Sequence, residues 1–253
     1  MRRRACESGG GKVIKQVLPG SIAARRGIRP GDRVLEINGA PIVDEIDYRF
    51  AIADADVTMA VLDGAGRKRI HRISKKESDD LGLVFRPFRM RRCANSCIFC
   101  FYDQMPPGLR TSLYVKDDDY RLSFAQGSFI TLTNLREDDY RRIEAQRLSP
   151  LYVSVHATPP ETRALMLGKK SGAEVLPPLR RLARAGIALH TQIVLCPGFN
   201  DGAVLETTLN DLASLTPHVR SIAIVPVGLT RHRAGLHPLR PVTRLMAKQV
   251  IAQ

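Results

Sequence analysis

Three cysteines stand close together in the middle of the chain. Cys93, Cys97 and Cys100 follow the pattern C-x3-C-x2-C, which places three thiols on one short loop. Thiolates are the preferred ligands of iron–sulfur clusters, and three of them on a tight loop can hold one corner of a [4Fe–4S] cube. Three protein ligands leave one iron open, and an open metal position lets the metal act on a bound molecule. The spacing therefore predicts a reactive cluster.

Two other interpretations of these cysteines stay open. A structural zinc ion needs four ligands and usually two C-x2-C pairs, so His156 or Cys196 would have to complete such a site from far along the chain. Alternatively, the three cysteines are unrelated core residues. Cys6 brings the total to five, and an odd number argues against a disulfide framework.

The cysteine loop lies in a stretch where predicted strands alternate with predicted helices. Strands separated by single helices need crossover connections, which produce a parallel sheet or barrel. The fold class is therefore α/β, a partial (β/α) barrel with the cysteine loop after its first strand and the site at the carboxyl ends of the strands. The strands are expected at 83–88, 128–133, 151–155, 187–194 and 221–225, and the helices at 137–146, 160–167, 173–185, 203–215 and 242–252.

Several side chains fall at the ends of these predicted strands. Asn134 follows the second strand, Ser154 and His156 end the third on the same face, Gln192 lies near the end of the fourth, and Val225 ends the fifth. They are candidates for contact with a bound cofactor. Asn134 is equally well explained as a turn or helix cap, and His156 as a structural histidine.

An acidic run, Asp117 to Asp119, falls on the long segment after the cysteines. It lacks the ligand spacing of a calcium loop. It is expected to be an acidic loop that faces a substrate, or a solvated run.

The first 75 residues differ in pattern from the rest. A strand is expected at 12–17, Ser21 is expected to cap a one-turn helix at 22–26, and Asn38-Gly39 marks a tight turn after a strand at 33–38. The string VLPGSIAARRGIRPGDRVLEINGAPI resembles the bacterial form of the PDZ domain. PDZ domains add a peptide as an extra strand, so the resemblance implies a protein or peptide partner. The groove loop would have to come from residues 9–11.

The cysteine region also resembles a known family. C-x3-C-x-aromatic-C, followed by SPLYVSVHATPPETRALMLG and HTQIVLCPGFNDG, is similar to the radical SAM superfamily. The match is closest to uncharacterised bacterial Fe–S oxidoreductase-type proteins that join a PDZ domain, a radical SAM barrel and a C-terminal domain of unknown function (DUF512). It runs from about Gly10 to Thr243.

The resemblance implies a [4Fe–4S] cluster on the three cysteines and S-adenosylmethionine (SAM) on its open iron. It places Phe99 near the adenine, and Asn134, Ser154, His156, Gln192 and Val225 among the SAM contacts. It implies reductive cleavage of SAM to a 5′-deoxyadenosyl radical, with a flavodoxin- or ferredoxin-type electron donor. It names neither a substrate nor a catalytic residue. A chain ending at residue 253 is expected to lack a sixth barrel strand and the DUF512 domain.

The expected domains are a basic tail at 1–9, a PDZ-like domain at 10–76 and a radical SAM partial barrel at 77–253. Two other functions remain open: an interaction protein that recruits a partner through its PDZ-like domain while the truncated barrel is inactive, and a radical SAM enzyme that modifies nucleic acid. The nucleic-acid alternative depends on charge, because 39 Lys and Arg residues against 25 Asp and Glu residues give a formal net charge of +14. Without a secretory signal or a long apolar run, a cytoplasmic protein with no membrane contact is expected.

Overall fold

A computed structural model describes residues 10–253, and the chain divides into two compact units, Met1–Arg89 and Met90–Gln253. The expected basic tail at 1–9 lies outside the described residues. Each unit has its own sheet, and the candidate site lies wholly within the second unit.

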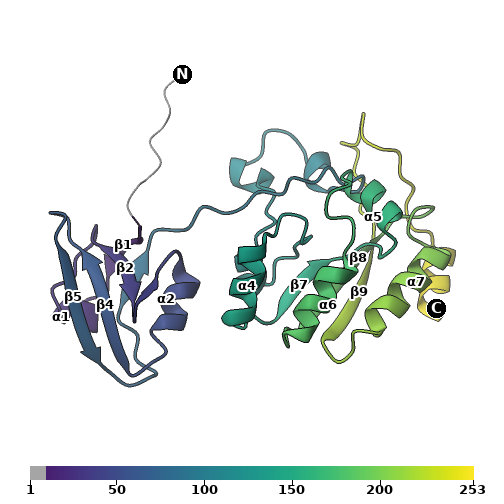
Figure 1. Cartoon of the computed structure of the whole chain (residues 1–253). Helices are drawn as coiled ribbons and strands as arrows, with labels where there is room; N and C mark the ends of the chain where they lie inside the picture. Colours follow the sequence, from purple (N-terminus) through teal and green to yellow (C-terminus); the bar gives the residue numbers. More distant parts are fainter. Residues whose placement is uncertain (1–9) are drawn as a thin grey trace. The chain divides into compact units, whose positions relative to one another are not determined.

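The first unit is built on an antiparallel sheet with two short helices (Figure 1). Ser21 caps the first helix as predicted, since its hydroxyl accepts the backbone N–H of Ala24 at 3.2 Å. The strand order is β5-β4-β2-β1-β6, with β3 paired to β2. The elements are β1 (Lys12–Val17), α1 (Ile22–Arg25), β2 (Arg33–Ile37), β3 (Ala40–Pro41), α2 (Glu45–Ala51), β4 (Asp56–Leu62), β5 (Lys68–Ser74) and β6 (Leu83–Phe85).

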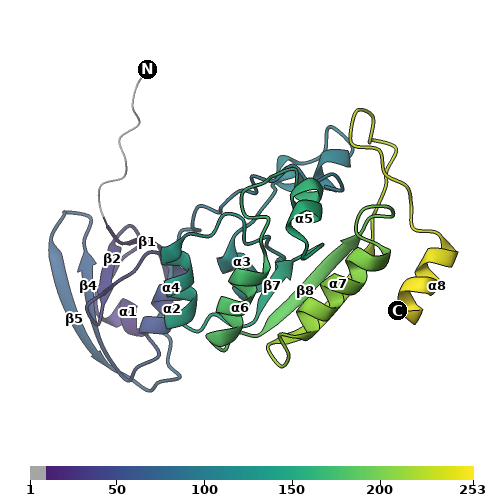
Figure 2. The ribbon, with the colours of Figure 1, turned by 45° about the vertical axis from the view of Figure 1, so that its right-hand side comes forward.

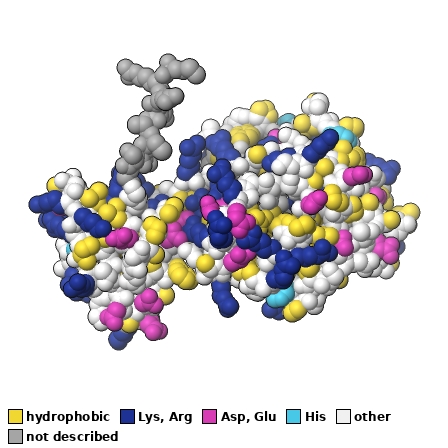
Figure 3. Space-filling view, in the orientation of Figure 1, with side chains coloured by type: hydrophobic (Ala, Val, Ile, Leu, Met, Phe, Trp, Pro, Cys, Tyr) yellow, Lys and Arg dark blue, Asp and Glu magenta, His cyan; other side chains and the backbone are white. Residues whose placement is uncertain are grey.

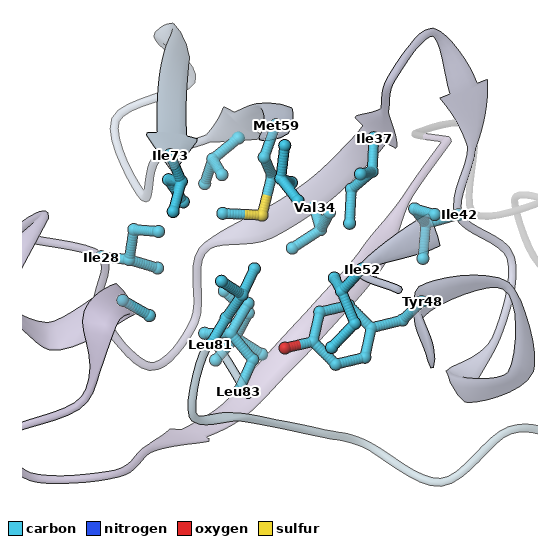
Figure 4. Packing of buried hydrophobic residues seen from close by; sticks show 14 of the residues in the cluster. Ile28, Val34, Ile37, Ile42, Tyr48, Ile52, Met59, Ile73, Leu81 and Leu83 are labelled. Carbon is cyan, nitrogen blue, oxygen red and sulfur yellow. The ribbon is translucent and has the colours of Figure 1, made fainter. Parts of the chain in front are cut away.

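Buried residues from several of these strands form the core of the first unit. Val34 and Ile37 of β2 and Met59 of β4 are fully buried, and Figure 4 shows them packed with Tyr48 of α2 and with Leu81. The pairing of β2 with β4 shifts register between Val34 and Glu36, so both Val34 and Ile37 are buried although they stand three residues apart, and this burial stabilises the fold. The predicted β-rich unit is confirmed.

The second unit contains a parallel sheet of three strands in the order β7-β8-β9. Helices α4, α6 and α7 lie along one side of this sheet (Figures 1 and 2). The predicted alternation of strands and helices is therefore present from 137 onward. The elements are η1 (Tyr102–Gln104), η2 (Thr111–Tyr114), α3 (Tyr120–Gln126), α4 (Glu137–Ala145), β7 (Leu151–Ser154), α5 (Pro160–Leu167), α6 (Leu176–Arg184), β8 (Leu189–Leu195), α7 (Gly202–Ala213), β9 (Val219–Pro226) and α8 (Arg244–Ala252).

The structure corrects two predicted strands. The segment at 83–88 is not the first strand of the second unit: its regular part, β6, pairs antiparallel with β1 in the first unit. Its alternating pattern suits either sheet, and only the pairing partner decides. The segment at 128–133 makes one isolated parallel bridge, between Ile130 and Val153, in place of a strand. The division between the units after Arg89 also falls later than the expected boundary at 76/77.

The helix α3 was missed by the sequence prediction. Asp119 caps it through a hydrogen bond from the backbone N–H of Arg121 at 3.0 Å, and Gly127 ends it in the left-handed conformation. The sequence signal for this helix is a capping aspartate followed two turns later by a glycine.

Basic and acidic side chains are interleaved over the helical face of the second unit that Figure 3 presents. Arg181 of α6 pairs with Glu137 and Glu144 of α4. Among residues 10–253, no helix is long and apolar enough to cross a membrane.

Candidate functional site

A cavity of about 450 Å³ opens at the carboxyl ends of β7, β8 and β9. Its volume falls within the roughly 300–1,000 Å³ typical of small-molecule sites. Aromatic and aliphatic side chains make up much of the wall, and a few polar groups face the interior. The lining residues are Cys97, Phe99, Cys100, Phe101, Tyr102, Asp117, Ser128, Phe129, Thr131, Ser154, His156, Gln192, Val194, Val225, Pro226 and Gly228.

The cavity brings together most of the residues singled out from the sequence. Two of the three cysteines line it, together with the predicted cofactor contacts Phe99, Ser154, His156, Gln192 and Val225. Ser154 lies opposite Gln192 in the register of β7 and β8.

Cys93 and Asn134 are not among the lining residues. The side-chain amide of Asn134 donates to the backbone carbonyl of Asp118 at 2.7 Å. Thr131, three residues earlier, reaches the cavity from the same segment. Ile130 is the residue of this segment that pairs with β7, and Asn134 lies four residues beyond that bridge.

The cysteine loop is held against the end of α5 by its backbone. The N–H of Ser96 donates to the carbonyl of Leu167, and the N–H of Ile98 donates to the carbonyl of Met166, both at 3.0 Å. Gly168 ends α5 with φ +61°, and a Cβ built there would lie 2.4 Å from the carbonyl oxygen of Ser96. Only glycine therefore permits this close approach.

A buried polar network holds the same loop from the other side. The Asn95 amide donates to the Thr131 hydroxyl at 3.0 Å, and the Thr133 hydroxyl donates back to the Asn95 carbonyl oxygen at 3.1 Å. Asp118 accepts both the backbone N–H and the hydroxyl of Thr131, each at 2.7 Å. Because each of these groups is satisfied, the network fixes the loop relative to the segment around Thr131.

The three cysteine thiols are half-buried and interact with one another electrostatically. Burial, together with the neighbouring Cys93 and Cys100, raises the pKa of the Cys97 thiol to about 12. Burial also raises the pKa of Cys93. Lys116 lies beside Cys100 and pairs with Asp103. Without a bound metal, the Cys93 and Cys97 thiols thus keep their protons at neutral pH, and metal binding has to displace them.

The donor set fits an iron–sulfur cluster in its chemistry. Three thiols stand on one backbone-anchored loop, and two of them face a cavity large enough for a second small molecule. In the described part of the chain, no three Cys, His, Asp or Glu side chains converge in a group that could hold a metal ion. The fit is therefore one of ligand type and of spacing along the chain.

His156 is buried in the cavity wall and stays neutral. Its ring lies 4.5 Å from the ring of Phe99, and its Nδ1 accepts the backbone N–H of Val194 at 3.2 Å. Burial and the nearby Arg163 lower its pKa to about 3. Because Nδ1 accepts, the ring proton sits on Nε2. The backbone of His156 has φ +65°, a left-handed conformation that non-glycine residues adopt at strained sites.

Arg163 is a residue of this region that the sequence analysis missed. Its side chain is fully buried in α5, and its guanidinium donates to the carbonyls of Thr131 at 2.8 Å, Val155 at 3.0 Å, Gly172 at 2.6 Å and Ser154 at 3.3 Å. Burial lowers its pKa to about 10, so it remains charged at neutral pH. The guanidinium therefore links the end of β7 to the segment around Thr131, and both carry residues that line the cavity. The sequence signal for this role is an arginine on the face of α5 that is buried.

The Asn200 side chain connects the ends of two strands. Its amide nitrogen donates to the carbonyls of His156 at 2.8 Å and Val194 at 2.9 Å, and its oxygen accepts the N–H of Cys196 at 2.7 Å. It thereby sets the position of His156 relative to β8.

Two known protein families match different parts of the chain. The family model described as a PDZ domain matches residues 13–63, and the model described as a radical SAM-like domain matches residues 75–222. No curated protein matches the chain in sequence. A crystal structure of a radical SAM methyltransferase from Sphaerobacter thermophilus shares 12% identity with a TM-score of 0.33, covering 92% of this chain and 77% of the other. At that TM-score the likeness carries no argument about the reaction.

The radical SAM-like match starts within the first unit, before β6, and covers more than half of the chain. It includes the cysteine loop, α5 and the ends of β7 and β8 that line the cavity, and it stops at residue 222, within β9. The chain therefore belongs to the radical SAM-like domain family and carries a PDZ domain before it.

Proposed function

We propose that the cavity binds SAM beside a [4Fe–4S] cluster held by Cys93, Cys97 and Cys100, and that the protein reductively cleaves SAM. The observation that carries this proposal is the position of Cys97 and Cys100 in the same cavity wall as the ends of the parallel strands. A reduced cluster would supply the electron that splits SAM into methionine and a 5′-deoxyadenosyl radical, which takes a hydrogen atom from the substrate.

The residues of the cavity have distinct parts in this proposal. Phe99 and Val225 offer apolar surface to the adenine, and Ser154 and Gln192 offer hydrogen bonds to the ribose or carboxylate of SAM. Neutral His156 offers an N–H at Nε2. The aromatic wall excludes water, which protects a radical from side reactions. We also propose that β7 to β9 form part of a barrel of the radical SAM type.

The test is anaerobic reconstitution of the full chain with iron and sulfide. About four irons per chain and dithionite-dependent formation of 5′-deoxyadenosine are expected. Cys97→Ala and Cys100→Ala should each lower the iron content and abolish SAM cleavage. Cys196→Ala is the matched control: Cys196 is buried outside the loop, and its loss should leave the iron content unchanged. A colourless preparation that holds zinc, with Cys196 needed for the metal, would contradict the proposal.

A second candidate function is peptide capture by the PDZ domain. The supporting observation is that β6 forms one edge of the first sheet, with β1 as its single strand partner among the described residues. An edge strand offers unpaired backbone groups to an added peptide strand. This edge is formed by residues 83–85, and the carboxylate-binding loop predicted at 9–11 stays a prediction. Binding of fluorescent peptides with a free carboxyl terminus to the full chain tests it; equal binding of amidated peptides would contradict PDZ-type capture.

A further inference from the structure

The three consecutive aspartates after the cysteine loop have different surroundings. Asp119 caps α3, accepts the backbone N–H of Arg91 at 2.9 Å and pairs with the guanidinium of Arg121. Asp118 accepts two hydrogen bonds from Thr131. Both carboxylates are almost fully buried and each has partners within the fold. Their roles are structural.

Asp117 differs from both neighbours because it lines the cavity. Its carboxylate oxygen Oδ2 is buried and has no hydrogen-bond partner among residues 10–253. The lining contains no Lys or Arg, and the one imidazole in it, His156, is neutral. Lys116, the chain neighbour of Asp117, is already paired with Asp103. The cavity thus holds one carboxylate and no cation to balance it.

A carboxylate oxygen withdrawn from water without a partner is costly, and the cost disappears when a cation binds beside it. The surrounding side chains also favour a cation. Phe101, Tyr102 and Phe129 line the same cavity, and the rings of Phe101 and Tyr102 lie 4.1 Å apart. The negative faces of aromatic rings attract cations, most strongly in a desolvated site.

We propose that Asp117 binds the cationic group of the molecule that occupies this cavity. Two sources carry that chemistry: the sulfonium or ammonium group of SAM, and a protonated amine on the substrate. The inference rests on the proposed function only where the cation belongs to SAM. In either case Asp117 acts as a binding residue and not as a ligand of the cluster.

The decisive variant is Asp117→Asn, which keeps the shape of the side chain and removes its charge. Asp138→Asn is the matched control, because the Asp138 side chain is 86% exposed on α4, away from the cavity. Dissociation constants for SAM and for S-adenosylhomocysteine, which lacks the sulfonium charge, are measured by calorimetry on reconstituted protein. A third probe, n-butylammonium, is titrated with and without SAM.

Loss of a charge pair with the sulfonium, or of a charge-assisted hydrogen bond from an ammonium group, should weaken binding about tenfold or more. If Asp117 faces the sulfonium, the variant loses affinity for SAM and not for S-adenosylhomocysteine; if it faces the ammonium, it loses affinity for both. If it faces a substrate amine, both constants stay unchanged, and saturable n-butylammonium binding to the wild-type protein disappears. An Asp117→Asn protein that binds all three probes like the wild type overturns the inference. So does a lower iron content, which would make Asp117 a cluster ligand.

A measurement without any cofactor separates this inference from the proposed function. Because the unpartnered carboxylate is unfavourable in the unliganded fold, Asp117→Asn should unfold at the same temperature as the wild type or higher. A midpoint several degrees lower would show that the carboxylate already has a structural partner, and would overturn the inference. If the wild-type protein does not bind SAM, the proposed function fails, while the n-butylammonium and unfolding measurements still test Asp117.

Discussion

At the scale of single residues, burial sets the chemistry of the cavity. His156 and Arg163 are both basic and both buried, yet they hold different charges at neutral pH. Desolvation moves the pKa of His156 to about 3, below neutrality, whereas the pKa of Arg163 falls only to about 10. The cavity wall therefore contains a neutral imidazole donor, and a permanent cation lies behind it.

The neutral state of His156 predicts a pH dependence of stability. In the unfolded chain its pKa returns to about 6.5, so unfolding takes up a proton below that pH. The contribution is fully present above pH 6.5 and is lost as the pH falls toward 3. At pH 5.5 the loss should be about 1.4 kcal/mol. Asn tolerates the left-handed backbone at this position, so His156→Asn is the suitable variant.

Urea unfolding of the metal-free chain at pH 7.5 and 5.5, followed by circular dichroism, measures this effect. The decrease in unfolding free energy should be smaller in His156→Asn than in the wild type by about that amount. Equal decreases in the two proteins would show that His156 is protonated in the folded state.

At the scale of elements, α5 positions the cysteine loop. The carbonyls of Met166 and Leu167 at its end accept N–H groups from the loop, while Arg163 in its middle joins the strand ends. One helix thus contacts both the cysteine loop and the strand ends, and so holds these two parts of the cavity wall in position relative to each other. Helix termini leave such carbonyls free for outside partners.

The close approach at Gly168 gives a prediction for this element. Gly168→Ala should displace the cysteine loop, because its Cβ would lie 2.4 Å from a backbone oxygen that cannot move away freely. Gly186→Ala is the matched control, since Gly186 has φ +77° and no other atom within 4 Å of the added Cβ. Both variants lose about 1–2 kcal/mol from the left-handed backbone. Only Gly168→Ala should also lose iron on reconstitution, several-fold; equal iron contents would contradict the positioning role of this contact.

At the scale of the whole molecule, the chain consists of two units whose division falls after Arg89. The strand β6 belongs to the first sheet although the radical SAM-like match begins before it. Some basic side chains, such as Arg181, are paired with carboxylates, and the net charge of +14 by itself does not locate a nucleic-acid surface.

This division predicts where limited trypsin digestion of the full chain cuts. Residues 86–90 have no regular secondary structure, and Arg89 is exposed, so the first cut should follow Arg89. The amino-terminal fragment should then keep β6, which mass spectrometry identifies directly. Arg89→Gln should remove this cut. A stable fragment ending at Lys75 or Lys76 would instead support the boundary that the sequence predicted.

Local patterns predicted many of the regular elements, although α3 was missed and the segment at 128–133 is not a strand. Ser21 and the period of two in 12–17 predicted α1 and β1, and helix-period segments from 137 onward predicted α4 to α8 within a few residues. The cavity gathers Cys97, Cys100, Phe99, Ser154, His156, Gln192 and Val225, which sequence reasoning had selected because parallel strands end at one edge.

Pairing and burial were decided only by the tertiary structure. An alternating segment such as 83–88 suits any sheet, and its partner β1 lies some 70 residues earlier in the chain. Arg163, Asn200 and the unpartnered oxygen of Asp117 acquire their roles from groups brought together by folding. The sequence by itself determined the three thiols, their spacing and the order of the elements. Which polar groups found partners, and which one was left facing the cavity, depended on long-range contacts that no local pattern encodes.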